Sequence, residues 1–305
     1  MGSLLDIANQ KVFGLEAEYM VGRSARSELC IKTPLVSLQH AAIRWTGDLW
    51  EVKDLGSRNG TYLNGRRLEP GQDYRLARGD TLAFGDPTRT WEVCDDEPPC
   101  VMVIALNDGD MVTLAGDMLG IPSHDEPLAT IYRGADGLWR LECSDRPLRV
   151  LQNKEVFEVS GRSWRFACPE IISVTRQSTL VTRIEDLKLH FAVSLDEEHV
   201  QLRAECPSCA LDLGSRGHNY LLLTLARQRL DDAERGLSPT ACGWMLLEQL
   251  TEGLKTTPQQ LNLDVHRIRV QFAEAGIIGA VGIVERRHRA KQLRIGVGAL
   301  EISRL

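Results

Sequence analysis

Three short stretches of small, basic and hydrogen-bonding residues lie between positions 22 and 65. They are Gly22-Arg23-Ser24, then Ser37-Leu38-Gln39-His40, then residues 57–65 with the letters SRNGTYLNG. The planar fork of an arginine matches two phosphate oxygens, and a serine hydroxyl donates to the same kind of anion. The pattern therefore predicts an anion site for a phosphorylated side chain.

Strand-like runs flank these stretches and must position them. Runs of about five residues, at 18–21, 40–45, 50–54, 61–64 and 81–84, are separated by turn signals such as Asn59-Gly60 and Arg78-Gly79-Asp80. Short strands with a turn every 8–12 residues are typical of an antiparallel sandwich. We therefore expect residues 1–97 to form a β-sandwich whose loops converge at one end.

The order Gly-Arg-Ser, Ser-x-x-His and Asp-Leu-Gly-Ser-x-Asn-Gly-Thr-x-Leu-Asn-Gly resembles the forkhead-associated (FHA) domain over roughly residues 13–93. The resemblance implies a phosphothreonine peptide as ligand, with Arg23 on the phosphate, Ser37 donating to it and Asn59 bonded to the peptide backbone. The phosphopeptide-binding residues that it implies are Arg23, Ser24, Ser37, Arg58 and Asn59. The residues that it assigns to loop geometry are Gly22, His40, Gly60, Asn64 and Gly65.

Two positions depart from the family pattern. Leu38 replaces the polar or basic residue that often follows the serine, and Arg58 lies where many members have threonine. The loss of a donor weakens the expected grip on the phosphate, whereas Arg58 could select an acidic residue in the peptide. The segment has no nucleophile with a base and no paired carboxylates, so we expect no catalysis.

Length and composition describe an ordinary globular protein. The chain has 305 residues, 43% of them hydrophobic and 26% charged. At roughly 100–200 residues per domain, two or three domains are expected. No apolar run approaches the ~18–20 residues of a membrane span or follows a basic start as in a signal peptide. We therefore expect a cytoplasmic protein without a membrane partner. Eight cysteines, scattered through apolar runs, predict reduced thiols.

The net charge of −6 is unevenly distributed along the chain. Residues 1–100 carry 12 Lys/Arg and 15 Asp/Glu, and residues 101–211 carry 11 and 17. Residues 212–305 carry 13 and 10, a balance of +3. A polyanionic partner would therefore bind to the last third.

The middle segment, residues 98–175, follows the connector Glu97-Pro98-Pro99 and is again rich in strand patterns. The letters TGDLWEV at 46–52 recur as ADGLWRL at 135–141, an offset of 89. That offset places Glu126 at Ser37, Ala129 at His40 and Leu148 at Asn59, a set that would repel phosphate. The segment is either a degenerate FHA-like sandwich or a β-rich contact module, since any hairpin with a central Trp gives such an echo.

The last segment, residues 176–305, combines hairpins with helices. Two strand-like runs, 188–193 and 199–204, precede helical patterns over 216–234, from Ser238-Pro239 and from Thr257-Pro258 to Gly276. Runs at 281–284 and 292–297 predict strands around a basic tip at 285–291. Cys206-Pro207-Ser208-Cys209 lacks a second cysteine or histidine pair, so we expect a turn, and neither metal nor cofactor.

This order of elements resembles the OmpR/PhoB-like winged helix over roughly residues 186–297, with residues 261–269 as the recognition helix. In that family the third helix enters the DNA major groove and the wing follows a minor groove. Winged helices also serve as protein-interaction modules, and a run of surface charge is usually only a solvated face. The residues that the resemblance directs toward DNA are Asn262, His266, Arg267, Arg269, Arg286, Arg287, Arg289 and Lys291.

Together these patterns predict a mainly β, multidomain, bacterial-type regulator without enzymatic activity. Residues 1–97 would bind phosphothreonine, residues 98–175 would space or couple, and residues 176–305 would bind double-stranded DNA. The expected partners are a phosphothreonine protein and its Ser/Thr kinase. The alternative is a phospho-dependent adaptor whose winged helix contacts protein.

Overall fold

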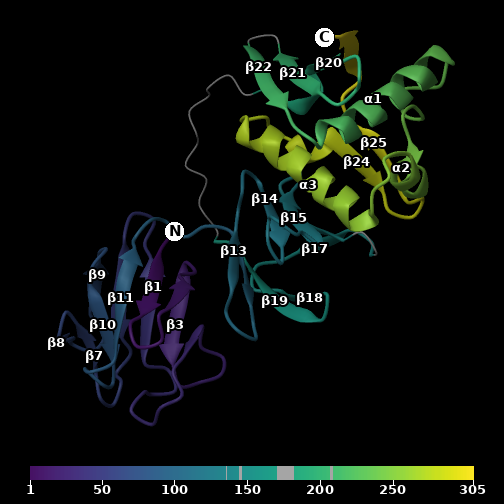
Figure 1. The fold of residues 1–305 in the computed structure, drawn as a ribbon. Helices are drawn as coiled ribbons and strands as arrows, with labels where there is room; N and C mark the ends of the chain where they lie inside the picture. The colour runs from purple at the N-terminus through teal and green to yellow at the C-terminus, as the bar shows by residue number, and fades with distance from the viewer. Residues whose placement is uncertain (135, 144–145, 170–181, 207–208) are drawn as a thin grey trace. The chain divides into compact units, whose positions relative to one another are not determined.

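The computed structural model describes residues 1–134, 136–143, 146–169, 182–206 and 209–305 (Figure 1). The protein is mainly β, and its residues fall into two compact units. Unit 1 contains residues 1–111, 153–156 and 165–174, and unit 2 contains residues 112–152, 157–164 and 175–305. The expected boundary after residue 175 and the expected turn at residues 207–208 lie outside the described residues.

Residues 3–95 of unit 1 form two sheets. One has the strand order β2-β1-β11-β10-β7-β8 and the other β4-β3-β5-β6-β9, in which β4 runs parallel to β3. The five strands expected from the sequence here are present, as β3, β5, β6, β7 and β10. The bounds are β1 Ser3–Asp6, β2 Lys11–Gly14, β3 Glu18–Gly22, β4 Leu29–Cys30, β5 Ala41–Trp45, β6 Trp50–Asp54, β7 Thr61–Leu63, β8 Arg66–Arg67, β9 Asp73–Leu76, β10 Thr81–Phe84 and β11 Thr90–Asp95.

Alternation along these strands builds the core of the sandwich. On β6 the side chains of Trp50 and Val52 are 1% and 0% exposed, while Lys53 between Val52 and Asp54 remains half-buried. Trp91 of β11 packs against Phe84 with ring centroids 5.3 Å apart. Burial of each such side chain stabilises the fold by about 1.5–3 kcal/mol. This core holds the strand ends, and hence the loops, at fixed positions.

The middle of the chain contains eight more strands, four of which form a sheet of unit 2 with the order β14-β15-β16-β17. In the hairpin β5–β6 Ala41 pairs with Asp54, and in β15–β16 Ala129 pairs with Cys143. The second hairpin has a turn one residue longer, so Leu128 and not Ala129 corresponds to His40, which corrects the constant offset. The bounds are β12 Met102–Ala105, β13 Met111–Thr113, β14 Met118–Ile121, β15 Ala129–Arg133, β16 Trp139–Cys143, β17 Arg149–Leu151, β18 Val156–Val159 and β19 Arg162–Ala167.

The last part of unit 2 has three α-helices and two further sheets. The sheet orders are β22-β21-β20-β26 and β23-β25-β24, and β26 runs parallel to β20. Leucines of α1 and the apolar face of α3 share one core with β20 and β21. The bounds are β20 Lys188–Val193, β21 Val200–Cys206, β22 Cys209–Ser215, α1 Asn219–Glu234, β23 Met245–Leu246, α2 Leu247–Gly253, α3 Pro258–Glu274, β24 Val284–Arg287, β25 Gln292–Ile295 and β26 Ala299–Arg304, with short 3₁₀ turns at Ile184–Asp186 and Ala280–Ile283.

The expected start of the second helix at Ser238-Pro239 is wrong. Residues 238–243 form a turn, and α2 begins only at Leu247. Gly243 has φ +82°, and its N–H donates to the Asp232 carboxylate at 2.8 Å. This contact with α1 holds the turn in a conformation that a continuous helix cannot adopt. By contrast, α3 begins and ends as expected, because Thr257 caps Gln260 N–H at 3.1 Å and Gly276 follows at φ +80°.

Other differences concern the C-terminal strands. Residues 281–284 are mostly a 3₁₀ turn, and Arg286 and Arg287 belong to β24, so the tip of the hairpin is only residues 288–291. Strands β22 and β26 were not expected.

Cys206 is disulfide-bonded, which differs from the reduced thiols expected for all eight cysteines.

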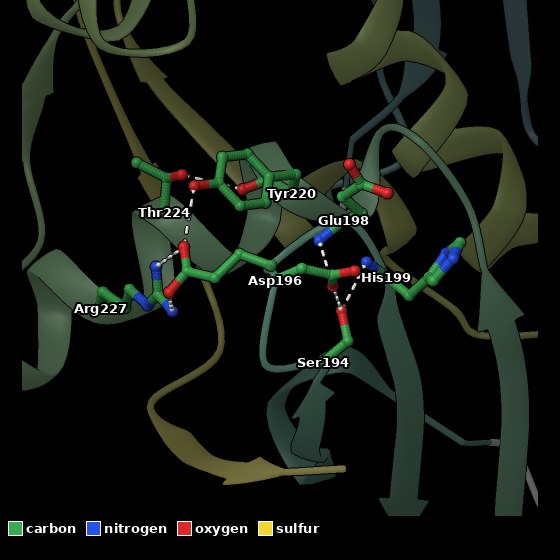
Figure 2. A network of polar contacts seen from close by, with 8 residues as sticks. Ser194, Asp196, Glu198, His199, Tyr220, Thr224 and Arg227 are labelled. Carbon is green, nitrogen blue, oxygen red and sulfur yellow. Dashed lines mark hydrogen bonds and ion pairs between the residues drawn. The ribbon is translucent and has the colours of Figure 1, made fainter.

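The turn between β20 and β21 is fixed to α1. Glu197 accepts hydrogen bonds from Tyr220 Oη at 3.1 Å and from Arg227 Nη2 at 2.8 Å. Figure 2 shows Tyr220 and Arg227 reaching from the helix toward this turn, where Asp196 contacts Ser194. The Arg227 and Tyr220 contacts lower the pKa of Glu197.

Among the helices of the described residues, none has the length and apolar character that a bilayer crossing needs.

Candidate functional site

The loop that follows β3 is joined by backbone bonds to the loop that precedes β5. Arg23 N–H donates to Ser37 O at 2.8 Å, and Ser24 N–H donates to Leu38 O at 3.2 Å. A Cβ at Gly22 would overlap the Leu38 carbonyl oxygen, so only glycine permits this approach. The structure thus brings Arg23 and Ser37, 14 residues apart in sequence, to one place.

His40 connects these loops to the loop after β6. Its Nδ1 accepts from Ser37 N–H at 3.1 Å, and its Nε2 lies 3.1 Å from Gly60 O. A carbonyl oxygen only accepts, so the proton is on Nε2 and the ring is neutral. The imidazole is fully buried, with its edge toward Phe84, and burial lowers its pKa. His40 therefore bonds to two loops and is not exposed to a ligand.

Asp54, at the end of β6, organises the same loop from below. Its carboxylate accepts from the hydroxyls of Ser57 and Thr61, both at 2.6 Å, and from two backbone amides at 2.9 Å. Burial raises the pKa of Asp54, but the hydrogen bonds outweigh this and hold the pKa below its usual value. No role was predicted from the sequence for Asp54, Ser57 and Thr61. The trace of this contact in the sequence is an acid at the end of a buried strand, followed by Leu-Gly-Ser.

Ser37 and Arg58 are joined directly. Arg58 N–H donates to Ser37 Oγ at 3.1 Å. Because the oxygen accepts this bond, the hydroxyl proton of Ser37 is free to point toward another acceptor. Arg23 Nε donates to Val36 O at 3.2 Å, which orients the guanidinium of this exposed residue. Asn59 Nδ2 donates to Leu35 O at 2.8 Å, which fixes the side-chain amide.

Arg23, Ser37 and Arg58 line an open groove of about 710 Å³, whereas Asn59 lies next to Arg58 outside its lining. Three exposed guanidiniums, those of Arg23, Arg26 and Arg58, give the groove a positive charge. Ser24 is also in its wall, and its Oγ accepts from Arg26 N–H at 3.2 Å. The rest of the lining combines apolar side chains, Leu38 among them, with the polar side chains of Ser27 and Gln39. Such a groove can bind an extended peptide through one anionic group and a few apolar contacts.

The remaining loop residues lie beside the groove and do not line it. Asn64, at φ +51°, and Gly65, at φ +76°, form the turn between β7 and β8. Asn64 bonds to Asp80 and to Thr81 N–H, both at 2.8 Å, so its role is structural. Gly60, at φ +88°, stacks so close to Arg67 that a Cβ would overlap the guanidinium.

The residues expected to contact DNA are not all on one free surface of unit 2. Arg267, Arg287, Arg289 and Lys291 are exposed, and Arg287 stacks on Trp244 at 3.9 Å. His266 and Arg269, in contrast, are 2% and 3% exposed. They are covered by the sheet β14–β17, with Arg269 Nη1 at 3.2 Å from the carboxylate of Glu142. The exposed recognition face that the sequence predicts is therefore wrong for these two residues.

Arg286 and Asn262 belong to the same buried group. Arg286 Nη2 donates to Asn262 Oδ1 at 2.8 Å, and Arg286 Nε lies 3.3 Å from Glu142 Oε1. The sequence gave no sign of Glu142, because nothing in β16 points to a helix 127 residues away.

No group of three or more His, Cys, Asp or Glu residues suited to a metal ion occurs in the part of the chain that the structure describes.

Comparison with known proteins identifies the groove-bearing segment. The FHA domain family model matches residues 19–85. Protein FraH of Nostoc sp. is 47% identical over 51 residues, 17% of this chain and 18% of that protein. The oxoglutarate dehydrogenase inhibitor of Corynebacterium jeikeium is 41% identical over 64 residues, 21% of this chain and 42% of that protein. Each match thus spans less than half of the relative.

Two solved structures similar to this segment are FHA domains or contain phosphopeptide. EmbR of Mycobacterium tuberculosis in complex with a low-affinity phosphopeptide is 26% identical over 32% of this chain and 25% of that chain, with a TM-score of 0.29. The FhaA FHA domain complexed with the intracellular domain of Rv3910 is 29% identical over 30% and 99%, with a TM-score of 0.27. The family model thus identifies residues 19–85 as a forkhead-associated domain, a type of module that implies phosphothreonine-dependent protein interaction and signalling.

Proposed function

We propose that the groove between Arg23 and Arg58 binds a phosphothreonine peptide. Arg23 would hold the phosphate through its terminal nitrogens, and Ser37 would donate its free proton to the same anion. Ser24 would line the phosphate site, and Asn59 would bond to the peptide backbone. The observation that carries this proposal is the Arg58 N–H to Ser37 Oγ bond of 3.1 Å, since it leaves the hydroxyl as a donor in a groove of three guanidiniums.

Arg58 would also select the peptide sequence. Its backbone is fixed by Ser37, while its guanidinium is exposed in the groove. An exposed arginine beside the phosphate site favours an acidic residue in the ligand, and the apolar wall around Leu38 favours an aliphatic neighbour.

The test is a titration with paired phosphorylated and unphosphorylated threonine peptides. Arg23→Ala should weaken binding of the phosphorylated peptide by about tenfold to a hundredfold, the 1.5–3 kcal/mol of a charged hydrogen bond. Arg75→Ala removes the same charge from an exposed position on β9 and should leave affinity unchanged. Equal affinity for both peptides, or no effect of Arg23→Ala, would refute the assignment.

For the whole chain, we propose a regulator that acts downstream of a Ser/Thr kinase and binds DNA through a C-terminal winged helix. The order of three helices and a closing hairpin, β24–β25, supports this fold. Arg267 on α3, and Arg289 and Lys291 at the hairpin tip, are exposed and would contact phosphates. Arg287, which stacks on Trp244, would add a fourth cation.

DNA binding through these cations should weaken steeply as salt rises. Each phosphate contact contributes roughly 0.9 to the slope of log affinity against log salt. Replacing both Arg289 and Lys291 with alanine should therefore reduce the slope by about two. Arg216→Ala with Arg235→Ala, two exposed sites outside the hairpin, is the matched control. A protein that shows no salt-sensitive binding to any duplex would exclude this function.

The second candidate is a phospho-dependent adaptor, and one observation favours it. The polar face of α3 contacts protein, because β15 and β16 cover His266 and Arg269. An adaptor would show no salt-sensitive binding to duplex DNA, whereas its phosphopeptide affinity would remain.

The middle sheet is best explained as a degenerate FHA-like domain that cannot bind phosphate. Its order, β14-β15-β16-β17, repeats β3-β5-β6-β9, and Arg162 stacks on Trp164 as Arg89 does on Trp91. The hairpin register puts Leu128 and Cys143 where the first domain has His40 and Asp54. A leucine side chain has no acceptor and a cysteine sulfur is only a weak one, so neither matches the acceptors that His40 and Asp54 offer to backbone N–H groups.

A further inference from the structure

The polar face of α3 is covered by the sheet β14–β17 within unit 2. His266 and Arg269 are 2% and 3% exposed, although both types of residue usually remain in contact with water. An arginine is fully buried only where an anion or acceptors compensate for the lost hydration. We therefore expect the sheet to contain groups that specifically compensate the buried side chains of His266 and Arg269.

One row of residues across the sheet forms the contact. Gly120 pairs with Thr130, and Thr130 pairs with Glu142, so the three share one face of the sheet. Thr130 Oγ1 lies 3.4 Å from His266 Nδ1, and His124 Nδ1 lies 3.3 Å from His266 Nε2. A Cβ at Gly120 would lie 3.0 Å from the His266 ring, so the absent side chain makes room for it.

Glu142 neutralises the centre of this contact. Its carboxylate forms ion pairs with Arg269, whose Nη1 lies 3.2 Å away, and with Arg286, whose Nε lies 3.3 Å away. Burial raises the pKa of Glu142, but the two guanidiniums outweigh it and keep the carboxylate ionised. Arginines hold a phosphate group in the same arrangement, with two guanidiniums around one anion.

We propose that the sheet β14–β17 and the phosphate backbone of DNA compete for this face of α3, with Glu142 in the position of the phosphate. The inference rests on the DNA binding proposed above. Of the residues proposed to contact DNA, Arg267, Arg287, Arg289 and Lys291 are exposed in the closed state seen here. Release of the sheet adds Asn262, His266, Arg269 and Arg286 to the surface for DNA.

The closed contact is held by charge and has an uncompensated donor. Arg269 Nε is buried and has no hydrogen-bond partner among the residues that the structure describes. Desolvation of ions offsets most of the attraction between them, whereas removal of one partner leaves the other charges buried without compensation. The equilibrium between closed and open states should therefore shift strongly when Glu142 loses its charge.

Glu142→Gln in the full chain tests the proposal. Glutamine keeps the volume but leaves Arg269 and Arg286 without a counter-ion, so the open state should be favoured. Affinity for a fluorescent mixed-sequence duplex should rise at least tenfold. Glu126→Gln removes the same charge from an exposed site and is the matched control. Gly120→Val, which inserts a side chain against His266, is a second opening variant, and circular dichroism checks that each variant is folded.

Opening has a readout that does not involve DNA. In the closed state burial, with the neighbouring His124 and two arginines, lowers the pKa of His266 to about 4, and exposure should return it toward 6.5. An NMR titration of the imidazole follows this change. Higher DNA affinity together with a raised pKa of His266 is the expected result, and adding Arg269→Ala to Glu142→Gln should reverse the gain in affinity.

Two other outcomes overturn the proposal in distinguishable ways. If both opening variants are folded, bind DNA as the wild type does and keep the low pKa of His266, competition is refuted while DNA binding stands. If the pKa of His266 rises but neither the wild type nor the variants bind DNA, the proposed DNA function is refuted and the competition with it.

Discussion

The role of His40, which joins three loops, can be tested by replacing it with leucine. The hairpin register places a leucine, Leu128, at the corresponding position of the middle segment. His40→Leu keeps a buried apolar side chain, but it leaves Ser37 N–H and Gly60 C=O without the ring that now bonds to both at 3.1 Å. Each buried backbone group left unsatisfied costs about 1–3 kcal/mol. The leucine recovers part of this through apolar burial, so a net loss of about 2–4 kcal/mol is expected.

Denaturant unfolding followed by tryptophan fluorescence measures this loss, since Trp50 and Trp91 are in the core of the same sandwich. A loss of 2–4 kcal/mol in a domain of ~100 residues corresponds to a fall in Tm of about 8–30 °C. Phosphopeptide affinity, measured where the variant is still folded, should also fall because Ser37 is no longer held in place. His199→Leu, at an exposed position, is the control. A His40→Leu protein as stable as the wild type and with the same affinity would show that the bridge has no role.

Three further predictions concern pH, an acid and a cap. The lowered pKa of His40 means that the folded state prefers the neutral ring, so stability is constant above about pH 6.5. It falls below that pH because the unfolded chain binds a proton that the folded state does not, a change that His40→Leu should lack. Asp54→Asn should cost about 2–4 kcal/mol in denaturant unfolding, because the amide cannot accept from the Ser57 and Thr61 hydroxyls and both backbone amides at once. Thr257→Ala should cost about 1 kcal/mol by removing the cap on Gln260 N–H, a change that thermal unfolding of unit 2 would detect.

The FHA domain was predictable because its determinants are local. Gly22, Ser37 and His40 lie at the spacing of the family pattern, and the strands between them alternate regularly. The same holds for α3, since Thr257-Pro258 and Gly276 mark its ends within the sequence itself. Even so, Asp54 was missed, because its hydrogen bonds connect a strand end to a loop in a way that no spacing rule describes.

The failures arise from contacts between distant segments. Ser238-Pro239 has the letters of a helix start, yet Asp232 of α1 holds Gly243 in a turn. On α3 the polar positions of His266 and Arg269 match a solvated face, and only the fold reveals Glu142 opposite them. The sequence of a helix does not show whether water or a carboxylate from another segment compensates the charge of a polar residue.

The parallel pairing of β26 with β20 has a consequence for how unit 2 is made. Val193 ends β20 and Ala299 begins β26, so 106 positions separate two neighbouring strands. Pairing over such a separation forms slowly. A ribosome-bound or truncated chain therefore presents β20 as an open edge with unpaired N–H and C=O groups, which can add a strand from another chain. Aggregation of chains that lack residues 299–304, and protection by a synthetic peptide of that sequence, would follow from this single pairing.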